Sequence, residues 1–431
     1  MAIVVALLSV LVDTYIYFEI RKASGRRSFW SRLYAATSVL LWIFLLIVLL
    51  MPRRDPSQDI TPVMWMLFSY MSVYVAKILY AVMSLIGKIP LLWKGKAIPT
   101  GFYVGIPVAV FAFLSMWWGA LVTTKEIEIN EVTIVSPALP EAFDNYRIVQ
   151  FSDAHVGTWG NDTTFVSQLV DTINSLHPDL IVFTGDVVNR NSQEINPFIT
   201  VLSRLRAKDG VYSIMGNHDY GDYTDWDNET DHLADRERMR AIQKQMGWLL
   251  LDNEHVFLRR DNDSIVLIGV ENWGEPPFHQ YGDLAKAYPF SPDSVNNIND
   301  SNFKILLSHN PEHWRREVSR ISNIDLTLSG HTHAMQIMFS AGPFKWSPSA
   351  LRYQEWGGLY KRANDSGRDV RIYVNIGCGE VGMPARIGAT PEITVITLTR
   401  AGTPTKATVV EQDNDTTSFL KTRRRPAAGR K

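Results

Sequence analysis

Cysteine is almost absent from this sequence, since Cys378 is the only one among 431 residues. A single thiol excludes an intramolecular disulfide and a metal site built on cysteines. Net charge is also nearly absent: 43 Lys and Arg residues stand against 44 Asp and Glu residues, which gives a formal charge of −1. No overall electrostatic field therefore favours a polyanionic partner.

Basic side chains are missing from one stretch of the chain. Residues 219–235 include seven Asp or Glu residues and no Lys or Arg. A nucleic acid contacts its partner mainly through phosphates, and these need positive charge on the protein. We therefore expect neither DNA nor RNA as a partner.

Long apolar runs are abundant, and most of them lie before residue 123. A bilayer-spanning helix takes about 20 apolar residues, and four windows are long enough: roughly 2–20, 34–51, 63–86 and 101–122. Buried helices of a soluble bundle are the alternative, but "LLWIFLLIVLLM" is apolar on all sides. The first window lacks a basic stretch before it and a cleavage site after it, so a removable signal peptide is disfavoured. Residues 1–122 are predicted to form a multi-pass transmembrane domain.

The loops between these windows differ in basic residues, which predicts the orientation. Residues 21–33 carry five Lys or Arg and residues 88–100 carry three, whereas the alternate segments carry three in all. Loops rich in Lys and Arg stay in the cytoplasm. With four spans, both termini and everything after residue 123 are then expected outside the cytoplasm, in the periplasm or at the cell exterior.

Two charged residues fall well inside the predicted spans, away from the span ends: Asp13 in the first and Lys77 in the third. At a rise of about 1.5 Å per residue their depths nearly match. A charge at that depth is costly unless it is paired or reaches the interface. The alternatives are a protonated Asp13 and a Lys77 that extends to the headgroups; the sharper hypothesis is that the two residues pair and join the first and third spans.

After residue 123 the pattern changes to short β-like runs that alternate with helical periodicity. One example is "YRIVQF", which is followed by a helical face over residues 162–176. Strands alternating with helices predict an α/β domain over residues 123–411. The remaining residues, 412–431, are polar and basic and are predicted to be a disordered tail.

Side chains that can hold a metal follow five of the β-like runs. In open α/β sheets the carboxyl ends of the strands meet at one crevice, so these residues are expected to converge. Taken alone, each group is an ordinary turn or a core histidine; five in succession are not expected by chance. The residues are Asp153 and His155 after "VQF", Asp186 after "VFT", Asn217 with His218 and Asp219 after "SIM", His309 after "LLS", and His331 with His333 after "LTLS".

This mixture of carboxylates and imidazoles suits two divalent cations held close together. Such ligands fit Mn, Fe or Zn better than Ca or Mg. A carboxylate can bridge two metals about 3.5–4 Å apart, a spacing suited to in-line displacement at phosphorus. Asp186, a lone carboxylate in the middle of the order, is the natural bridge.

The motifs D-x-H, G-D, G-N-H-D, a lone His and G-H-x-H, in this order, resemble the calcineurin-like metallophosphoesterases from about residue 123 to 400. The segments "YQEWGGLY", "GCGEVGMPARIG" and "PEITVITL" are similar to a bacterial membrane-associated branch. That branch is related to phosphodiesterases and to the UDP-2,3-diacylglucosamine pyrophosphatases of lipid A synthesis. The resemblance implies a four-layer α-β-β-α sandwich with two mixed sheets flanked by helices.

The resemblance also implies roles for individual residues. One metal would be held by Asp153, His155, Asp186 and His333, and the other by Asp186, Asn217, His309 and His331. His218 would lie beside the phosphate as a general acid or oxyanion stabiliser.

One departure from the superfamily is visible after the G-D motif. Protein phosphatases place an aspartate there that pairs with the catalytic histidine, whereas this chain reads "GDVVNR" with Asn189 near that position. The phosphoprotein phosphatase interpretation is therefore disfavoured. Arg190 is a candidate to contact a phosphate oxygen, with a surface position as the alternative, and Asp219 is a candidate for a substrate or supporting role.

We therefore expect a membrane-anchored dinuclear metal phosphohydrolase, in which a metal-bridged hydroxide attacks the phosphorus of a monoester or diester. The four-span anchor and two aromatic segments, "YGDYTDW" and "ENWGEPPFHQYG", favour a lipid-linked or membrane-proximal phosphoester. A soluble nucleotide is the competing small substrate. The alternatives for the whole chain are a UDP-2,3-diacylglucosamine-type pyrophosphatase, whose cytoplasmic substrate conflicts with the predicted orientation, and a catalytically silent metal-binding membrane module.

Overall fold

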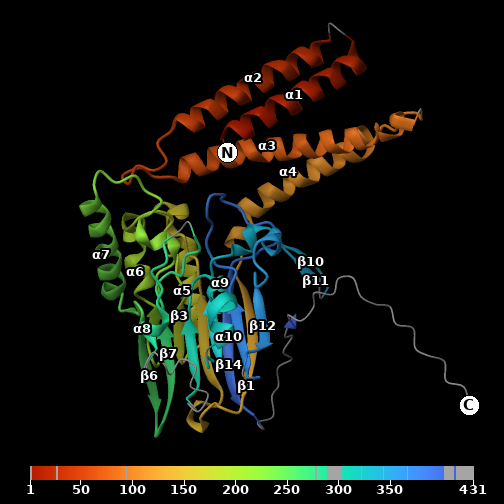
Figure 1. Cartoon of the computed structure of the whole chain (residues 1–431). Helices are drawn as coiled ribbons and strands as arrows, with labels where there is room; N and C mark the ends of the chain where they lie inside the picture. The colour runs from red at the N-terminus through yellow and green to blue at the C-terminus, as the bar shows by residue number, and fades with distance from the viewer. Residues whose placement is uncertain are drawn as a thin grey trace, which may run out of the picture.

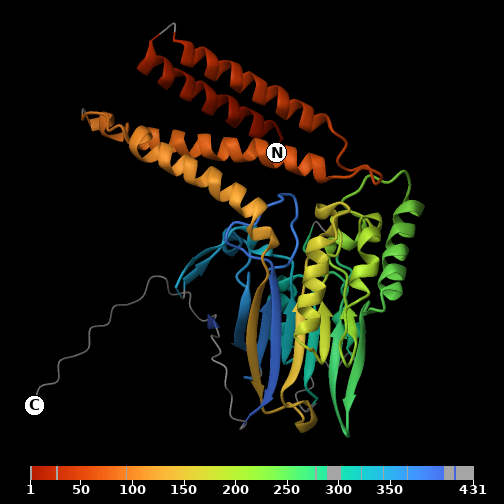
Figure 2. The ribbon, with the colours of Figure 1, turned by 180° about the vertical axis from the view of Figure 1, so that it is seen from behind.

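The computed structural model describes residues 2–25, 28–93, 95–276, 279–288, 302–321, 323–342, 344–365, 367–401 and 412–413. A group of long helices from the first quarter of the chain lies against one end of a β-rich part (Figures 1 and 2). The predicted tail, residues 412–431, lies outside the described residues except for Gln412–Asp413, which form strand β15.

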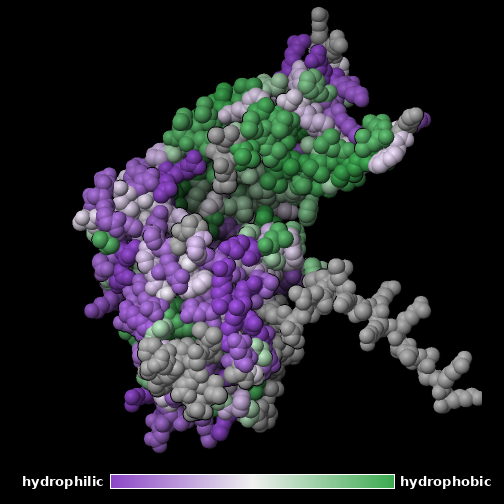
Figure 3. All heavy atoms as spheres, viewed as in Figure 1, coloured by the Kyte–Doolittle hydropathy of each residue, from purple (hydrophilic) through white to green (hydrophobic). Residues whose placement is uncertain are grey.

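Four long helices build the N-terminal region: α1 (Ala2–Ser24), α2 (Phe29–Leu50), α3 (Thr61–Ile86) and α4 (Ile106–Leu121). Their outer surface is a broad apolar band, which contrasts with the mostly polar surface of the β-rich part (Figure 3). By length and hydropathy, three described segments are candidate membrane spans: Phe29–Leu50, Thr61–Trp93 and Gly101–Lys125. The region is thus a membrane domain, while the count of four spans stays a prediction because α1 is not among the three.

Asp13 of α1 and Lys77 of α3 form the predicted pair, with 2.7 Å between Lys77 Nζ and Asp13 Oδ1. The Asp13 carboxylate also accepts hydrogen bonds from Tyr34 Oη (2.7 Å), Tyr74 Oη (2.6 Å) and Trp42 Nε1 (2.9 Å). Because Tyr34 and Trp42 belong to α2, this one carboxylate joins three helices. The proposed contact between the first and third helices is confirmed, and α2 takes part in it as well.

The β-rich part contains two mixed sheets. The first has the order β1 (Glu128–Ser136), β14 (Glu392–Arg400), β2 (Tyr146–Phe151), β3 (Leu180–Phe183), β4 (Val211–Ser213), β5 (Leu249–Leu250). The second has the order β15 (Gln412–Asp413), β12 (Gly358–Ala363), β13 (Asp369–Val374), β9 (Leu326–Ser329), β8 (Lys304–Leu307), β7 (Asp263–Gly269), β6 (Glu254–Arg260). In each sheet the central strands are parallel. The antiparallel pairs are β14 with β2 in the first sheet, and β12 with β13 and β6 with β7 towards the two edges of the second.

Alternating side chains on the strands create the layers. Ile148 and Val182 point from the first sheet into the core shared with the second sheet, whereas Val149 and Phe183 point to the helices on the other side. The helices are α5 (Thr164–Ser175), α6 (Ile199–Leu202) and α7 (Glu229–Gln245) on the first sheet, and α8 (Leu284–Ala287), α9 (Pro311–His313) and α10 (Ser319–Ile321) on the second. The predicted α-β-β-α order of layers is confirmed.

The membrane domain meets the β-rich part at the end where the central parallel strands finish (Figure 1). Thr61, the first residue of α3, donates a hydrogen bond to the carbonyl of Gly157, two residues after His155 (3.5 Å). Near the end of α4, the carbonyl of Gly119 accepts a hydrogen bond from the Arg386 amide (3.2 Å). The strand ends that carry the candidate metal ligands therefore face the membrane side of the molecule.

Candidate metal centre

Two groups of side chains that can hold a metal lie next to each other at these strand ends. The ligand atoms within each group lie within 4.8 Å of one another. The first group is Asp153, His155, Asp186 and His333, and the second is Asp186, His309 and His331. Asp186 belongs to both, as expected of a bridging carboxylate.

The first group is fully enclosed, since its four side chains are at most 6% exposed. His333 Nε2 lies 3.1 Å from Asp153 Oδ1 and 3.0 Å from His155 Nε2. The other nitrogen of His155, Nδ1, donates to the Val188 carbonyl (3.0 Å), so Nε2 is left as the lone-pair nitrogen that faces the group. This arrangement orients the imidazole as in metal sites whose second nitrogen is held by a carbonyl.

The second group has the same construction. His309 Nδ1 donates to the Thr184 carbonyl (2.7 Å), while Nε2 lies 3.1 Å from Asp186 Oδ2 and 3.2 Å from Asn217 Oδ1. His331 Nδ1 lies 2.9 Å from the same amide oxygen of Asn217. The structure thus brings together all seven residues that were expected to hold two metals.

The chemistry of this donor set fits cations. Burial, followed by the neighbouring imidazoles, lowers the pKa of His155 well below its usual range, and burial beside His309 lowers the pKa of His331 to about 3. Both rings are therefore neutral and able to ligate at pH 7. His155 Nε2 faces Asp186 Oδ2 (3.6 Å) and His333 Nε2 faces Asp153 Oδ1 (3.1 Å), and such a mixed set of imidazole nitrogens and carboxylate oxygens suits divalent cations such as Mn, Fe or Zn.

The carboxylates of the centre are ionised in spite of their burial. Burial alone would raise the pKa of Asp186, but the charges of His309 and His218 outweigh it and hold that pKa well below its usual range. Burial alone would lower the pKa of His309, but the charge of Asp186 outweighs it and raises the pKa of that imidazole to about 9. A divalent cation would take over the role that the protonated His309 plays beside Asp186.

Five of the ligand residues have left-handed backbone, which is rare for residues other than glycine. The φ angles are 51° for Asp153, 39° for His155, 63° for Asp186, 75° for His331 and 51° for His333. Each such residue costs free energy that surrounding contacts must offset, and such residues gather at functional sites.

Two glycines make room for the carboxylates. A Cβ atom at Gly216 would lie 2.2 Å from Asp186 Oδ1, and one at Gly330 would lie 2.3 Å from Asp153 Oδ2. Any side chain at either position would displace a carboxylate from the centre.

Asp219 lies beneath the centre and supports its backbone. Its carboxylate accepts hydrogen bonds from the amides of Asp186 (2.8 Å), Val187 (2.8 Å) and Gly216 (2.9 Å). Burial, with the charge of Asp186, raises the pKa of Asp219 to about 7. Of its two expected roles, the contacts match the supporting one.

His218 lies beside the centre rather than in either group. Its amide donates to Asp186 Oδ1 (2.8 Å), and its ring Nδ1 donates to the carbonyl of Asn189 (2.6 Å). The ring stacks on Tyr223, with 4.2 Å between centroids. The backbone of Asn189 therefore orients the histidine, and the acid–base capacity of the ring is at Nε2.

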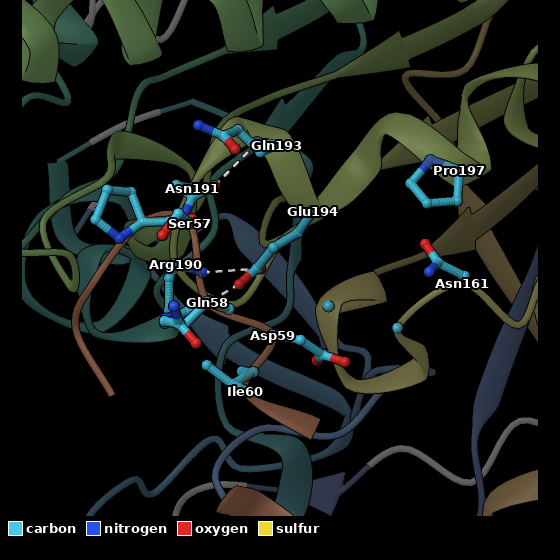
Figure 4. A pocket seen from close by; sticks show the side chains of 13 residues that line it. Ser57, Gln58, Asp59, Ile60, Asn161, Arg190, Asn191, Gln193, Glu194 and Pro197 are labelled. Atoms are coloured by element: carbon cyan, nitrogen blue, oxygen red, sulfur yellow. Dashed lines mark hydrogen bonds and ion pairs between the residues drawn. The ribbon is translucent and has the colours of Figure 1, made fainter. Parts of the chain in front are cut away.

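Arg190, expected as a candidate for a phosphate contact, has its guanidinium committed elsewhere. Its Nη atoms donate to the carbonyls of Arg53 (2.9 Å) and Gln58 (2.6 Å), and Nε pairs with Glu194 (2.9 Å). Figure 4 shows Arg190 and Glu194 pointing at each other beside the segment 56–60. This segment, residues 51–60 between α2 and α3, is called the α2–α3 loop below. Arg190 thus holds the α2–α3 loop against the catalytic part. A cavity of about 230 Å³ lies beside it, lined by residues of the loop and of the segment 190–197.

Three contacting residues were not predicted. Tyr353 Oη lies 3.0 Å from His331 Nε2, and Arg386 Nη2 lies 3.3 Å from His333 Nδ1. Tyr223 Oη accepts a hydrogen bond from Asn217 Nδ2 (2.9 Å). Each belongs to a segment singled out in the sequence, Tyr223 to "YGDYTDW", Tyr353 to "YQEWGGLY" and Arg386 to "GCGEVGMPARIG", but none was assigned a contact with a ligand residue. The second aromatic segment behaves differently: Trp273 stacks on His313 and is 8% exposed, and residues 277–278 lie outside the described residues.

Comparison with known proteins identifies two matching families. The calcineurin-like phosphoesterase family matches residues 146–335, and a family described as "Probable Calcineurin-like phosphoesterase, transmembrane domain" matches residues 1–123. The two matches together include the membrane domain and all the residues of the candidate metal centre.

Similar curated proteins have matching descriptions. The chain is 33% identical over 279 residues to the "Uncharacterized metallophosphoesterase YkuE" of Bacillus subtilis, a match that covers 63% of this chain and 85% of that protein. It is 31% identical over 292 residues to the "Transmembrane protein with metallophosphoesterase domain" of Bos taurus, covering 65% of this chain and 57% of the bovine protein. Among solved structures, the NAD nucleotidase of Haemophilus influenzae aligns with a TM-score of 0.37 at 14% identity, over 54% of this chain and 50% of that chain.

Proposed function

Because the chain belongs to the calcineurin-like phosphoesterases, as a membrane-associated member of that family, we propose that it hydrolyses the phosphoester of an amphiphilic substrate at the bilayer surface. One observation carries this proposal: the candidate metal centre is at the end of the catalytic part that meets the membrane domain. A headgroup held at the membrane surface would be presented to that end, whereas a soluble substrate needs no such placement.

Each residue of the centre has a proposed role. Asp153, His155 and His333 would hold one divalent cation, Asn217, His309 and His331 would hold the other, and Asp186, which belongs to both groups, would serve both. When bound, the cations supply Lewis acidity to the phosphoryl oxygens and acidify the attacking water. Mn, Fe and Zn all suit the mixed donors.

His218 acts beside the cations. With Nδ1 held by the carbonyl of Asn189, its Nε2 either donates a proton to the leaving oxygen or stabilises charge on a phosphoryl oxygen. Stacking on Tyr223 fixes the plane of the ring, so that Nε2 keeps one direction. Phosphate monoesters and diesters both fit this chemistry.

The catalytic part is proposed to face away from the cytoplasm. Eight Lys and Arg residues in 21–33 and 88–100, against three in the alternate segments, support this orientation. The same orientation argues against a cytoplasmic UDP-linked lipid as the substrate. The proposed boundaries are residue 122 for the membrane domain and residue 411 for the catalytic domain.

Hydrolysis of bis-p-nitrophenyl phosphate by the purified full-length chain tests the enzyme class. We expect turnover that needs Mn²⁺ and is abolished by a chelator. His218→Ala should lower kcat by about 10²–10⁴-fold, and Asp186→Asn by about 100-fold or more. Asp261→Asn is the matched control, because Asp261 is exposed at a turn far from the centre. Equal activity of Asp186→Asn and wild type would contradict the proposal.

A second assay separates the substrate class from the chemistry. Hydrolysis is compared, by chromatography of the products, between phospholipids in mixed micelles and water-soluble nucleotides, with the same enzyme and metal. We expect the higher kcat/KM on the lipid. Faster turnover of the nucleotides would contradict the lipid proposal and leave the metal-dependent phosphoesterase intact.

A further inference from the structure

A small hairpin lies outside both sheets: β10 (Phe339–Ala341) and β11 (Phe344–Trp346). Its register pairs Phe339 with Trp346 and Ala341 with Phe344. Since side chains alternate between the faces of a strand, these four share one face. Phe339 and Trp346 stack on that face, with 5.9 Å between ring centroids. The hairpin is therefore apolar on this side.

The opposite face is polar. It carries the remaining cross-strand pair, Ser340 and Lys345, and both residues are exposed. A two-stranded ribbon with one apolar and one cationic face has the pattern of an element that lies at a membrane surface.

The apolar face has no covering layer among the described residues. Phe339 is 55% exposed, Phe344 52% and Trp346 37%. An isolated hairpin of two strands is marginally stable in water and gains stability when its apolar face packs against another surface. Exposed aromatic side chains gathered on one face indicate such a contact.

The position of the hairpin identifies what that surface is. Met338, just before β10, donates its amide to the Ile387 carbonyl (2.8 Å), and the adjacent Arg386 amide bonds to Gly119 of α4. The hairpin thus leaves the catalytic part beside the end of α4 (Figure 1). Trp118 of that last helical turn is 63% exposed, and aromatic residues at helix ends mark the membrane interface.

An apolar groove continues from α4 towards the same segment. It has a volume of about 460 Å³, and Phe111, Leu114 and Trp118 of α4 line it together with Ile387 and Gly388. Its α4 wall belongs to a candidate membrane span, so hydrocarbon chains are available to fill it. The groove joins the lipid-facing side of α4 to the base of the hairpin.

We propose that the β10–β11 hairpin is an interfacial membrane anchor. Its Phe339, Ala341, Phe344 and Trp346 face enters the boundary between headgroups and acyl chains, and Lys345 stays among the headgroups. The hairpin adds a direct contact with the bilayer to the contacts that the catalytic part makes with the α2–α3 loop and the end of α4. This anchor requires that the chain is in a membrane and does not depend on the proposed reaction.

The chain is suited to a site-specific labelling test. Its one cysteine, Cys378, is 1% exposed, and burial raises the pKa of its thiol to about 12, so it does not react at neutral pH. We would place a fluorophore at Ala341→Cys on the apolar face, Ser340→Cys on the polar face and Asn262→Cys as a control. Asn262 is exposed in the turn of another hairpin, β6–β7, at the opposite end of the catalytic part. The full-length variants are reconstituted in vesicles that contain anionic lipid and acyl-chain nitroxide quenchers.

We expect strong quenching at 341, weaker quenching at 340 and none at 262. Equal quenching at 341 and 262 would overturn the proposal. So would a 341 probe that is shielded from aqueous iodide without being quenched by the lipid nitroxide, because a protein would then cover the face. If Ala341→Cys does not fold, Phe344→Cys tests the same face.

Discussion

Glu380 is a buried carboxyl group outside the metal centre, in the segment between β13 and β14. Its side chain is 1% exposed and its Oε1 has no hydrogen-bond partner among the described residues. Burial raises its pKa to about 8, and the nearby charge of Arg386 only partly opposes this shift. The group is therefore largely protonated in the folded protein at pH 7 and ionised in the unfolded chain.

This shift predicts a pH dependence of stability. Because the pKa of Glu380 is higher in the folded state, this residue adds to the free energy of unfolding. That contribution is fully present below the unfolded pKa of 4.5 and is lost as the pH rises through about 8. Glu380→Gln should therefore remove this part of the fall in stability with pH. The measurement is the thermal unfolding midpoint of the solubilised full-length chain between pH 5.5 and 8.5. Glu131→Gln, whose side chain is 71% exposed, is the control, and identical slopes for wild type and Glu380→Gln would contradict the prediction.

Residues of the metal centre were predictable because their chemistry and their position after strands coincide. Asp153, Asp186 and His309 each follow a buried β-like run, and parallel strands bring such positions together. Tyr353 and Arg386 belong to segments that carry the family resemblance, but their contacts with His331 and His333 were not predicted, because no periodic pattern in these segments places a single residue at the strand ends. The partners of Arg190 were not predictable either, because they are carbonyl groups of a loop more than a hundred residues earlier.

At the scale of elements, the strongest signals were the long apolar helices and the alternating strands. The helix predicted over 162–176 is α5 (Thr164–Ser175), because its apolar positions repeat at the helical period. The β10–β11 hairpin had no such signal, since three-residue strands are too short for alternation to differ from chance. Its apolar face becomes visible only once the pairing register is known.

The α2–α3 loop is an element whose contacts predict an effect on His218. Arg190 binds carbonyls of the loop, while the carbonyl of the preceding Asn189 orients the His218 ring. Arg190→Ala should free the α2–α3 loop and loosen the Asn189 carbonyl that orients the His218 ring. It should therefore lower kcat on a soluble phosphodiester by about tenfold, or ~1.4 kcal/mol of activation free energy. KM should change little, because the guanidinium of Arg190 is directed at Glu194 and the α2–α3 loop.

A second arginine from the same interface provides the matched control. Arg54 pairs with Asp225 (2.7 Å), but these side chains are 59% and 72% exposed, and such pairs contribute about 0–1 kcal/mol. Arg54→Ala should therefore leave kcat within about twofold. Arg190→Lys should restore part of the activity. If Arg190→Ala and Arg54→Ala have the same kcat, the loop does not position His218.

The contact between α1 and α3 predicts a coupling between two substitutions. Asp13→Leu removes the ionic partner of Lys77 and the acceptor of three hydrogen bonds, whereas Lys77→Leu leaves those three hydrogen bonds in place. Folded yield should fall most in Asp13→Leu, less in Lys77→Leu, and less in the double variant than in Asp13→Leu, with a coupling of about 0.5–3 kcal/mol. Asp13→Asn keeps an acceptor and should fall between wild type and Asp13→Leu. Size-exclusion profiles after detergent extraction give the yields, and purely additive losses would show that the pair is not coupled.

At the scale of the whole molecule, the helices have two distinct ends. The α2–α3 loop and the end of α4 lie against the catalytic part, whereas the connections after α1 and after α3 lie at the far end (Figures 1 and 2). The described residues of the basic segments 21–33 and 88–100 lie at that far end. This arrangement supports the proposed orientation, in which the basic loops and the catalytic part are on opposite sides of a membrane.

This arrangement predicts the outcome of reporter fusions in a bacterial host. Alkaline phosphatase, active only outside the cytoplasm, should be active when fused after residue 401, and a fluorescent protein that matures only in the cytoplasm should be dark there.

Replacing the five Lys and Arg residues of 21–33 and the three of 88–100 by Gln should produce a mixed population of the two membrane orientations, because the difference in loop charge sets the orientation. Replacing Lys361 and Arg362 of β12 instead is the control, since charges of a large folded domain have little influence on insertion. A silent phosphatase with a bright fluorescent fusion would place the catalytic part in the cytoplasm and return UDP-linked lipids to the set of candidate substrates.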